Sequence, residues 1–263
     1  MKTIERILLG FLLITFTFTS VAQEKEEYKP VYITITTGHW NSDPDTDYTD
    51  WLKTEQEYFN KVTKKNDLII GSGYYTHYFT PDNSEILFVS VYQNWEDLEN
   101  ASGITDRLIE EGWPDKDKRE AFFKKQSSYY SAMHSDEIYQ TTKFRKPLKT
   151  ESKKPLIYYV KRNKLGEGGK GFNEYFENIT MKNSFLRGYY THRHRWGANS
   201  RDMIEVFVFD KLSDIEGSFD ETQKLVEAYW PDKDKRKAFF KSYSKIFSGH
   251  GDYIYQNVPE LAK

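Results

Sequence analysis

The heptapeptide WPDKDKR occurs twice in this chain, at residues 113–119 and again at residues 230–236. Both copies lie on a longer internal match, whose other members are EYF (57–59 and 174–176), GYYTH (73–77 and 188–192) and IYQ (138–140 and 254–256). A nearly constant offset between matching segments is the pattern of a duplicated unit. The chain therefore contains two copies of a unit of about 110 residues, which is a usual size for one domain.

Each copy repeats the same order of hydrophobic patterns. Alternating β-branched and aromatic residues predict a strand, and residues 48–64 have the helical period that follows it in the first copy. The expected strands are 31–37, 73–79, 86–92 and 137–142, with counterparts at 156–160, 188–196, 203–209 and 253–258. A helix is expected at 96–111, and the heptapeptide opens an added helix before the last strand. This βαββαβ order is that of a ferredoxin-like unit, so the fold class is α+β.

Such a unit has helices on one face of a four-stranded sheet and leaves the other face bare, so two units can bury their bare faces against each other. Two fused units of this kind resemble the dimeric α+β barrel superfamily, which includes the antibiotic biosynthesis monooxygenases. The resemblance implies a pseudo-dimeric α+β barrel with a central cavity. It leaves the activity open, because members include cofactor-independent oxygenases, haem enzymes and proteins without known activity. The structural alternative is a pair of α+β domains lying side by side.

The chain divides into four segments on these patterns. Residues 1–22 resemble a signal peptide, because Lys2 and Arg6 precede an apolar run too short to span a membrane and small residues follow it. The first repeat is expected at 23–142, a basic linker that contains Pro147 at 143–154, and the second repeat at 155–263. We therefore expect a periplasmic or secreted protein that has no membrane contact after cleavage and is a monomeric pseudo-dimer.

Composition narrows the function classes. The chain has no cysteine, which excludes disulfides and thiolate metal sites, and its 38 basic and 40 acidic residues do not favour a nucleic-acid partner. Aromatic residues make up 17% of the sequence, including 20 tyrosines. Because tyrosine combines an apolar ring with one hydroxyl, many of them are expected in the core and in pockets.

Strand alternation divides the side chains into two faces. The aliphatic set that contains Leu87 and Ile204 is expected to pack under the helices, and the more mixed set is expected to face the barrel interior. That places Tyr32, Tyr159 and Glu205 inside. A buried carboxylate needs a partner or takes a raised pKa, so Glu205 is a candidate site residue if this face is internal, and a solvent-facing residue if it is not.

The GYYTH segments contain the remaining ligand-binding candidates. They place Tyr75 and His77 on one face of a strand, and Tyr190, His192 and His194 on the matching face of the second copy. Alternation does not show which face lines the cavity. The histidines are candidates for proton transfer or ligation near neutral pH, or for structural hydrogen bonds at a strand end.

Two further histidines, His134 and His250, are expected at the end of the added helix, where a structural role suffices. No metal site is predicted.

The heptapeptide itself has the features of a helix start, since proline suits the first turn and aspartates favour the positive helix end. We expect it to form a structural corner with symmetric contacts across the barrel, or a ligand or partner surface, through these residues: Trp113, Asp115, Asp117, Arg119, Trp230, Asp232, Asp234 and Arg236.

The leading functional hypothesis is that the exported barrel binds a small apolar or aromatic molecule in a cavity lined by tyrosine and histidine. One alternative is a non-enzymatic envelope protein whose barrel is filled by its own side chains. Another, from the resemblance alone, is a cofactor-independent or haem-dependent oxygenase. No cofactor is predicted from the residues, and haem is retained only as what the resemblance implies.

Overall fold

The structure is a computed structural model that describes residues 28–41, 47–150 and 152–263. The expected signal peptide lies outside these residues. The first repeat contains β1 (Tyr32–Trp40), α1 (Tyr48–Lys61), β2 (Ile69–Phe79), β3 (Glu85–Tyr92), α2 (Trp95–Gly112), α3 (Lys116–Ser128) and β4 (Tyr130–Thr141). The second contains β5 (Ile157–Leu165), α4 (Phe172–Asn178), β6 (Gly188–Trp196), β7 (Asp202–Phe209), α5 (Ser213–Tyr229), α6 (Lys233–Tyr243) and β8 (Phe247–Asn257).

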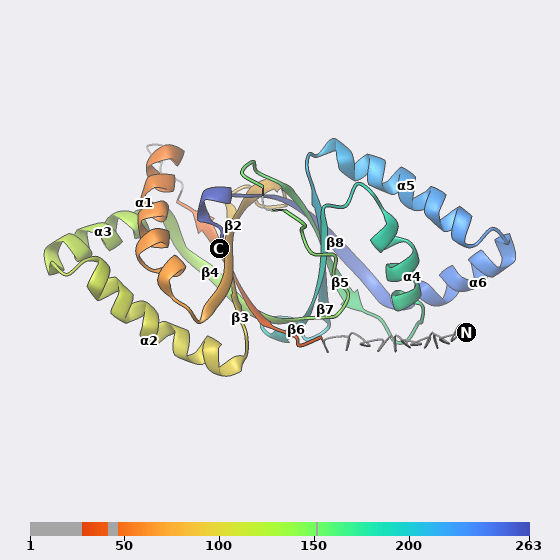
Figure 1. The fold of residues 1–263 in the computed structure, drawn as a ribbon, viewed down its shortest axis with the longest axis horizontal. Helices are drawn as coiled ribbons and strands as arrows, with labels where there is room; N and C mark the ends of the chain where they lie inside the picture. Colours follow the sequence, from red (N-terminus) through yellow and green to blue (C-terminus); the bar gives the residue numbers. More distant parts are fainter. Residues whose placement is uncertain (1–27, 42–46, 151) are drawn as a thin grey trace, which may run out of the picture.

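The strands form one closed antiparallel barrel in the order β1-β3-β2-β8-β5-β7-β6-β4. Within each repeat the order is that of a ferredoxin-like sheet, and the repeats join at two seams, β2 with β8 and β4 with β6. Closure leaves no free sheet edge. Figure 1 looks into the barrel between the two repeats, with α1, α2 and α3 on one flank and α4, α5 and α6 on the other. The predicted α+β fold of two ferredoxin-like units is therefore confirmed.

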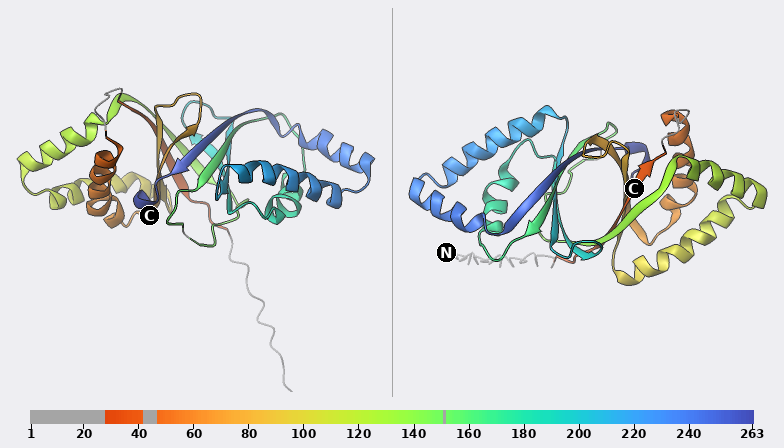
Figure 2. Two further views of the ribbon diagram at one scale, coloured as in Figure 1. Left: turned by 90° about the horizontal axis from the view of Figure 1, so that it is seen from above. Right: turned by 180° about the vertical axis from the view of Figure 1, so that it is seen from behind.

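The helices pack only on the outer faces of the barrel, as the two further views in Figure 2 show. Large aromatic side chains fill most of the space between sheet and helices. In the first repeat, Trp51 of α1 is fully buried and contacts Trp40 and Tyr74 from the sheet. The barrel interior has a separate cluster of mainly aliphatic residues and tyrosines. The molecule therefore has one core inside the barrel and further cores under the helices.

The heptapeptides form the corners between α2 and α3 and between α5 and α6. In the first corner, the Asp115 side chain accepts a 2.9 Å hydrogen bond from the Lys118 amide and so caps α3. The Arg119 guanidinium donates to the Trp113 carbonyl at 2.8 Å. The buried Trp113 ring packs against Phe122, with ring centroids 4.2 Å apart. These three contacts account for the tryptophan, the first aspartate and the arginine of the motif.

The second corner repeats this geometry. Asp232 caps α6 through the Lys235 amide at 3.0 Å, Arg236 donates to the Trp230 carbonyl at 2.9 Å, and Trp230 packs 4.1 Å from Phe239. Asp117 and its counterpart Asp234 lie in the first turns of α3 and α6, where negative charge suits the helix end. The corners lie at opposite tips of the molecule (Figure 1), so the expected contacts across the barrel are not formed.

One other expectation is corrected by the strands. His134 and His250 do not end a helix, because β4 and β8 begin at Tyr130 and Phe247 and contain them. The segment between the repeats contacts the second sheet, since Lys146 forms an antiparallel bridge with Tyr189 of β6. None of the helices in the described residues is both long and apolar enough to span a membrane.

Candidate functional site

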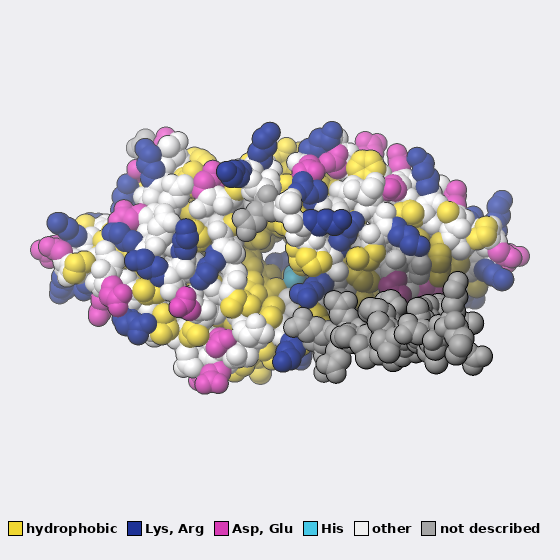
Figure 3. Space-filling view, viewed as in Figure 1, with side chains coloured by type: hydrophobic (Ala, Val, Ile, Leu, Met, Phe, Trp, Pro, Cys, Tyr) yellow, Lys and Arg dark blue, Asp and Glu magenta, His cyan; other side chains and the backbone are white. Residues whose placement is uncertain are grey.

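The barrel interior contains a cavity of about 340 Å³. The opening is visible between the two repeats in Figure 3, with hydrophobic atoms and a histidine at its wall. Its apolar wall consists of Ile33 and Ile35 of β1, Leu87, Val89 and Val91 of β3, Val160 of β5, and Ile204 and Val206 of β7. We call this cavity the lumen. An eight-stranded barrel is just wide enough to be filled by side chains or to hold one small ligand, and here short aliphatic side chains leave room.

The face assignment made from alternation is therefore reversed for these strands. The aliphatic set faces the lumen, and the mixed set lies under the helices. Tyr32 packs against Trp95 at the start of α2, with ring centroids 5.3 Å apart, and Tyr159 stacks on Phe207 on the helix side of the second sheet. Strand alternation shows which side chains share a face, but it does not show which face lies inside the barrel. Large aromatic side chains fill the gap between sheet and helices, whereas the barrel interior combines short aliphatic side chains with tyrosines.

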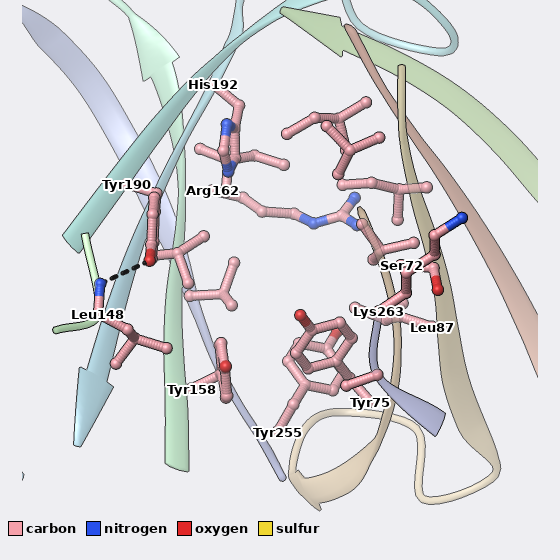
Figure 4. Close-up of a pocket in the computed structure, with 18 residues that line it drawn as sticks. Ser72, Tyr75, Leu87, Leu148, Tyr158, Arg162, Tyr190, His192, Tyr255 and Lys263 are labelled. Carbon is pink, nitrogen blue, oxygen red and sulfur yellow. Dashed lines mark hydrogen bonds between the residues drawn. The ribbon is translucent and has the colours of Figure 1, made fainter. Parts of the chain in front are cut away.

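Three of the five candidates from the GYYTH segments line the lumen: Tyr75, Tyr190 and His192. Figure 4 shows them around the cavity together with Tyr158 and Tyr255. The other two candidates lie further along their strands and outside the lining set. His77 Nδ1 is 2.8 Å from the Thr80 hydroxyl, and His194 packs edge to face against Tyr139.

His192 is neutral in the folded protein near neutral pH, because burial lowers its pKa to about 4. Its Nδ1 is buried and has no hydrogen-bond partner. Burial also raises the pKa of Tyr75 to about 12, so this hydroxyl keeps its proton. The lumen thus offers uncharged groups that donate or accept hydrogen bonds and does not offer a readily protonated base.

Arg162 is the functional candidate that the sequence reasoning missed. It shares the lumen face of β5 with Tyr158 and Val160, and its side chain reaches across the cavity in Figure 4. One guanidinium nitrogen donates to a Glu137 carboxylate oxygen at 3.2 Å. Burial alone would lower the Arg162 pKa, but Glu137, two tyrosines and Glu85 outweigh that effect and raise it. A correct prediction of which face of β5 lines the lumen would have identified Arg162.

Buried polar atoms without partners are concentrated in the lumen. Among the described residues, seven buried side-chain nitrogen or oxygen atoms have no hydrogen-bond partner. Four of them belong to residues that line the lumen: Ser72 Oγ, Arg162 Nε, His192 Nδ1 and Tyr255 Oη. Because buried polar atoms are nearly always satisfied in folded proteins, the partners of these four atoms come from water or another molecule inside the cavity.

One mouth of the lumen is partly covered by the segment that joins the repeats. Leu148 lines the cavity, and its backbone amide donates to the Tyr190 hydroxyl at 3.1 Å, the bond drawn in Figure 4. Ala262 and Lys263 lie in the same lining set. The Lys263 ammonium points away from the cavity, since it donates to the Asn66 carbonyl at 2.8 Å. The lysine therefore adds no free cation to the lumen.

A second, smaller cavity of about 190 Å³ lies between the second sheet and its helices, and Tyr159 and Glu205 line it. Glu205 is only 6% exposed, so it is neither in the lumen nor facing solvent. Its carboxylate accepts hydrogen bonds from Tyr189 at 2.6 Å and from Asn163 at 2.7 Å. These bonds satisfy the buried charge, which favours a structural role for Glu205.

In the first repeat, Trp51 and a buried carboxylate lie between the sheet and α1. There the buried carboxylate is Glu55 of α1, which accepts hydrogen bonds from Tyr74, Tyr130 and Gln126. Burial raises the Glu55 pKa, and these bonds oppose the rise. Trp51 occupies the space beside it and donates to the Tyr130 hydroxyl at 2.7 Å. Tyrosine and tryptophan side chains thus pack around the buried carboxylate of the first repeat.

The described residues do not fit haem in the lumen. A proximal histidine normally donates its second ring N–H to a carboxylate or carbonyl, whereas His192 Nδ1 has no such partner. The lumen cation that could bind a propionate, Arg162, is already paired with Glu137. The smaller cavity has no histidine in its wall. Nowhere in the described part of the chain do three or more histidine, aspartate or glutamate side chains group as metal ligands.

Comparison with known proteins supports the fold. No protein-family model and no curated protein sequence matches the chain. A provisionally named monooxygenase from Fusobacterium nucleatum subsp. nucleatum superposes with a TM-score of 0.55 at 14% identity, over 88% of this chain and 94% of that protein. An anthrone oxidase-like protein and a mutant chlorite dismutase from Candidatus Nitrospira defluvii each give 0.48 at 12% identity, over 88% of this chain and 92% of theirs. The strand order of the closed barrel and the superposition with a TM-score of 0.55 show that the chain has the dimeric α+β barrel fold in a fused tandem form.

Proposed function

We propose that the barrel is a binding protein for one small apolar or aromatic molecule, held in the lumen between the two repeats. The observation that carries this proposal is the combination of a mainly aliphatic cavity with four buried, unpartnered polar atoms in its wall. Ligand pockets characteristically have apolar walls and a few placed polar groups, and a volume of about 340 Å³ suits one small ring system. The alternative of a barrel filled by its own side chains does not agree with this cavity.

The proposal includes the setting expected from the sequence. The protein is exported, acts in the periplasm or outside the cell, and is a monomer because its two repeats already form the barrel that other chains form by dimerisation. Native mass spectrometry of protein from its own periplasm would give the chain mass, the loss of residues 1–22 and any retained ligand together. A dimer mass or an uncleaved leader would contradict this part of the proposal.

Tyrosine rings supply the aromatic contacts for the ligand. Tyr75 and Tyr158 pack edge to face with centroids 4.8 Å apart, across the seam between β2 and β8. Tyr190 and Tyr255 face the same space from the second repeat. Aromatic pairs of this geometry add stabilisation beyond area burial, so a planar ligand ring gains from the same arrangement. We assign no oxygenase step. Among the described side chains that line the lumen, none is a base with a pKa near neutral pH.

The test is binding of N-phenyl-1-naphthylamine, an uncharged dye that fluoresces in apolar cavities, to the wild-type chain and two matched variants. Val206→Trp places an indole in the lumen, and Lys161→Trp places the same indole on the opposite face of the neighbouring strand. We expect saturable binding at one site in the wild type, at least about tenfold weaker binding in V206W and less than about threefold change in K161W.

Circular dichroism of both variants controls for folding. Absence of dye binding to the wild type would overturn the proposal. Loss of binding in K161W with retention in V206W would place the ligand in the smaller cavity under the helices of the second repeat and would also overturn it.

A further inference from the structure

Arg162 extends into the lumen and is the lining residue with an unpartnered donor that carries a charge. Its Nε–H, the Tyr255 hydroxyl and His192 Nδ1 are all buried and unpartnered, whereas the aliphatic wall occupies the rest of the cavity. Nε–H of arginine can only donate, so it requires an acceptor atom. A ligand that satisfies this site must present an acceptor to Arg162 and an apolar body to the wall.

The charge balance around Arg162 decides what kind of acceptor fits. The guanidinium is already paired with Glu137 at 3.2 Å, and Glu85 and Asp202 also interact with it electrostatically. Among the other lining residues, His192 is neutral and the Lys263 ammonium donates to the Asn66 carbonyl outside the cavity. Three carboxylates thus act on Arg162 from outside the lumen lining, which contains no carboxylate side chain among the described residues.

A buried anion in this setting has two unfavourable contributions. Its charge must be desolvated, and it must compete with Glu137 for the same guanidinium while facing the other carboxylates. An uncharged carbonyl, ether or hydroxyl oxygen accepts the Nε–H without adding a charge, and it leaves the Arg162–Glu137 pair intact. An oxygen-free hydrocarbon leaves the Nε–H unsatisfied, which is costly for a buried donor.

We infer that the lumen selects an uncharged aromatic or apolar molecule with an acceptor oxygen that binds the Nε–H of Arg162, and that it discriminates against the carboxylate analogue. This inference rests on the proposed function, because it assumes that the ligand occupies the lumen. Figure 4 shows the geometry on which it depends, with Arg162 extending toward the centre of the cavity and the tyrosines around it.

Three 2-substituted naphthalenes of similar size test the inference by displacing N-phenyl-1-naphthylamine from the wild-type chain. 2-Acetylnaphthalene carries an uncharged acceptor, 2-ethylnaphthalene carries none, and 2-naphthoate is anionic at pH 7.5. We expect 2-acetylnaphthalene to bind about tenfold more tightly than 2-ethylnaphthalene, since the hydrogen bond is to a charged donor, and 2-naphthoate to bind most weakly.

The Glu137→Gln variant separates charge from shape. Glutamine keeps an acceptor for Arg162 but removes one negative charge, so 2-naphthoate should gain about fivefold in affinity while 2-acetylnaphthalene changes by less than about twofold. Glu167→Gln, in an exposed loop, is the matched control and should change neither. If E137Q does not fold, the wild-type series alone decides.

The proposed function and the inferred ligand class are contradicted by different results. If neither the dye nor any naphthalene binds, the proposed function is wrong. If the dye binds but 2-naphthoate binds as tightly as 2-acetylnaphthalene, or the ethyl and acetyl compounds bind equally, the lumen remains the site and only the ligand class is wrong.

Discussion

The hydroxyl of Tyr189 donates a 2.6 Å hydrogen bond to Glu205, and the equivalent tyrosine of the first repeat, Tyr74, donates to Glu55 at 3.0 Å. The two carboxylates do not occupy equivalent positions. Glu205 lies on β7, whereas Glu55 lies on α1. After duplication, each half therefore kept a buried tyrosine with a carboxylate acceptor, although the acceptor comes from a strand in one half and from a helix in the other.

Replacing Glu205 by glutamine should lower the free energy of unfolding by about 2 kcal/mol, because two hydrogen bonds to a charged acceptor are weakened. Glutamine cannot accept from Tyr189 and Asn163 equally well. Urea denaturation measures the change. The control is Glu177→Gln on the exposed side of α4, which should stay within about 0.5 kcal/mol of wild type. Equal stability of E205Q and wild type would show that the carboxylate is not needed for packing.

His192 makes stability depend on pH in a defined direction. Burial lowers its pKa to about 4 from 6.5, so between these values the unfolded chain binds a proton that the folded chain does not. Its contribution is fully present above pH 6.5 and is lost as pH falls toward 4, by about 3 kcal/mol in all. His192→Gln should remove this dependence in urea titrations at a series of pH values. His134→Gln is the control: it changes a side chain that is 60% exposed, so this variant should keep the pH dependence of stability.

The pair of Arg162 and Glu137 should show strong coupling. Arg162→Met leaves a buried carboxylate without its cation and should cost about 3 to 5 kcal/mol of unfolding free energy. The double variant R162M/E137L should cost less than the sum of the two single changes, because it leaves neither charge unpaired. Denaturant unfolding of all four proteins measures this cycle. Simple additivity would mean that the 3.2 Å contact contributes nothing.

The two helix caps should be independent. Asp115→Ala and Asp232→Ala should each cost about 1 kcal/mol, since each removes the side-chain acceptor at the start of a helix. Their effects should add within about 0.5 kcal/mol because the corners lie at opposite tips of the molecule. Asp117→Ala, in the same motif but not at the cap, should cost only a few tenths of a kcal/mol. A strongly non-additive double variant would indicate that the corners communicate.

The repeat and the local periodicities were sufficient to predict the fold class. Matching segments at a constant offset indicated two units, and the order of strand and helix patterns indicated ferredoxin-like sheets, both of which the barrel confirms. The heptapeptide was correctly predicted as a helix start, but its proline lies before the N-cap aspartate in both copies and not in the first helical turn. Local features of this kind depend on neighbours in sequence, and these are visible without a structure.

What lines the cavity was decided only by tertiary structure. Alternation placed Ile33 and Tyr32 on opposite faces of β1 but could not say which face closes on the second repeat. Closure of the barrel put short aliphatic side chains and four tyrosines inside, and it put Glu205 under the helices as a hydrogen-bonded buried group. The same closure brought Arg162 of β5 next to Glu137 of β4, which belong to different repeats. The sequence by itself determined the two repeated units and the start of the added helix in each. Strand pairing across the seams decided the chemistry of the lumen, because those contacts join residues far apart in the chain.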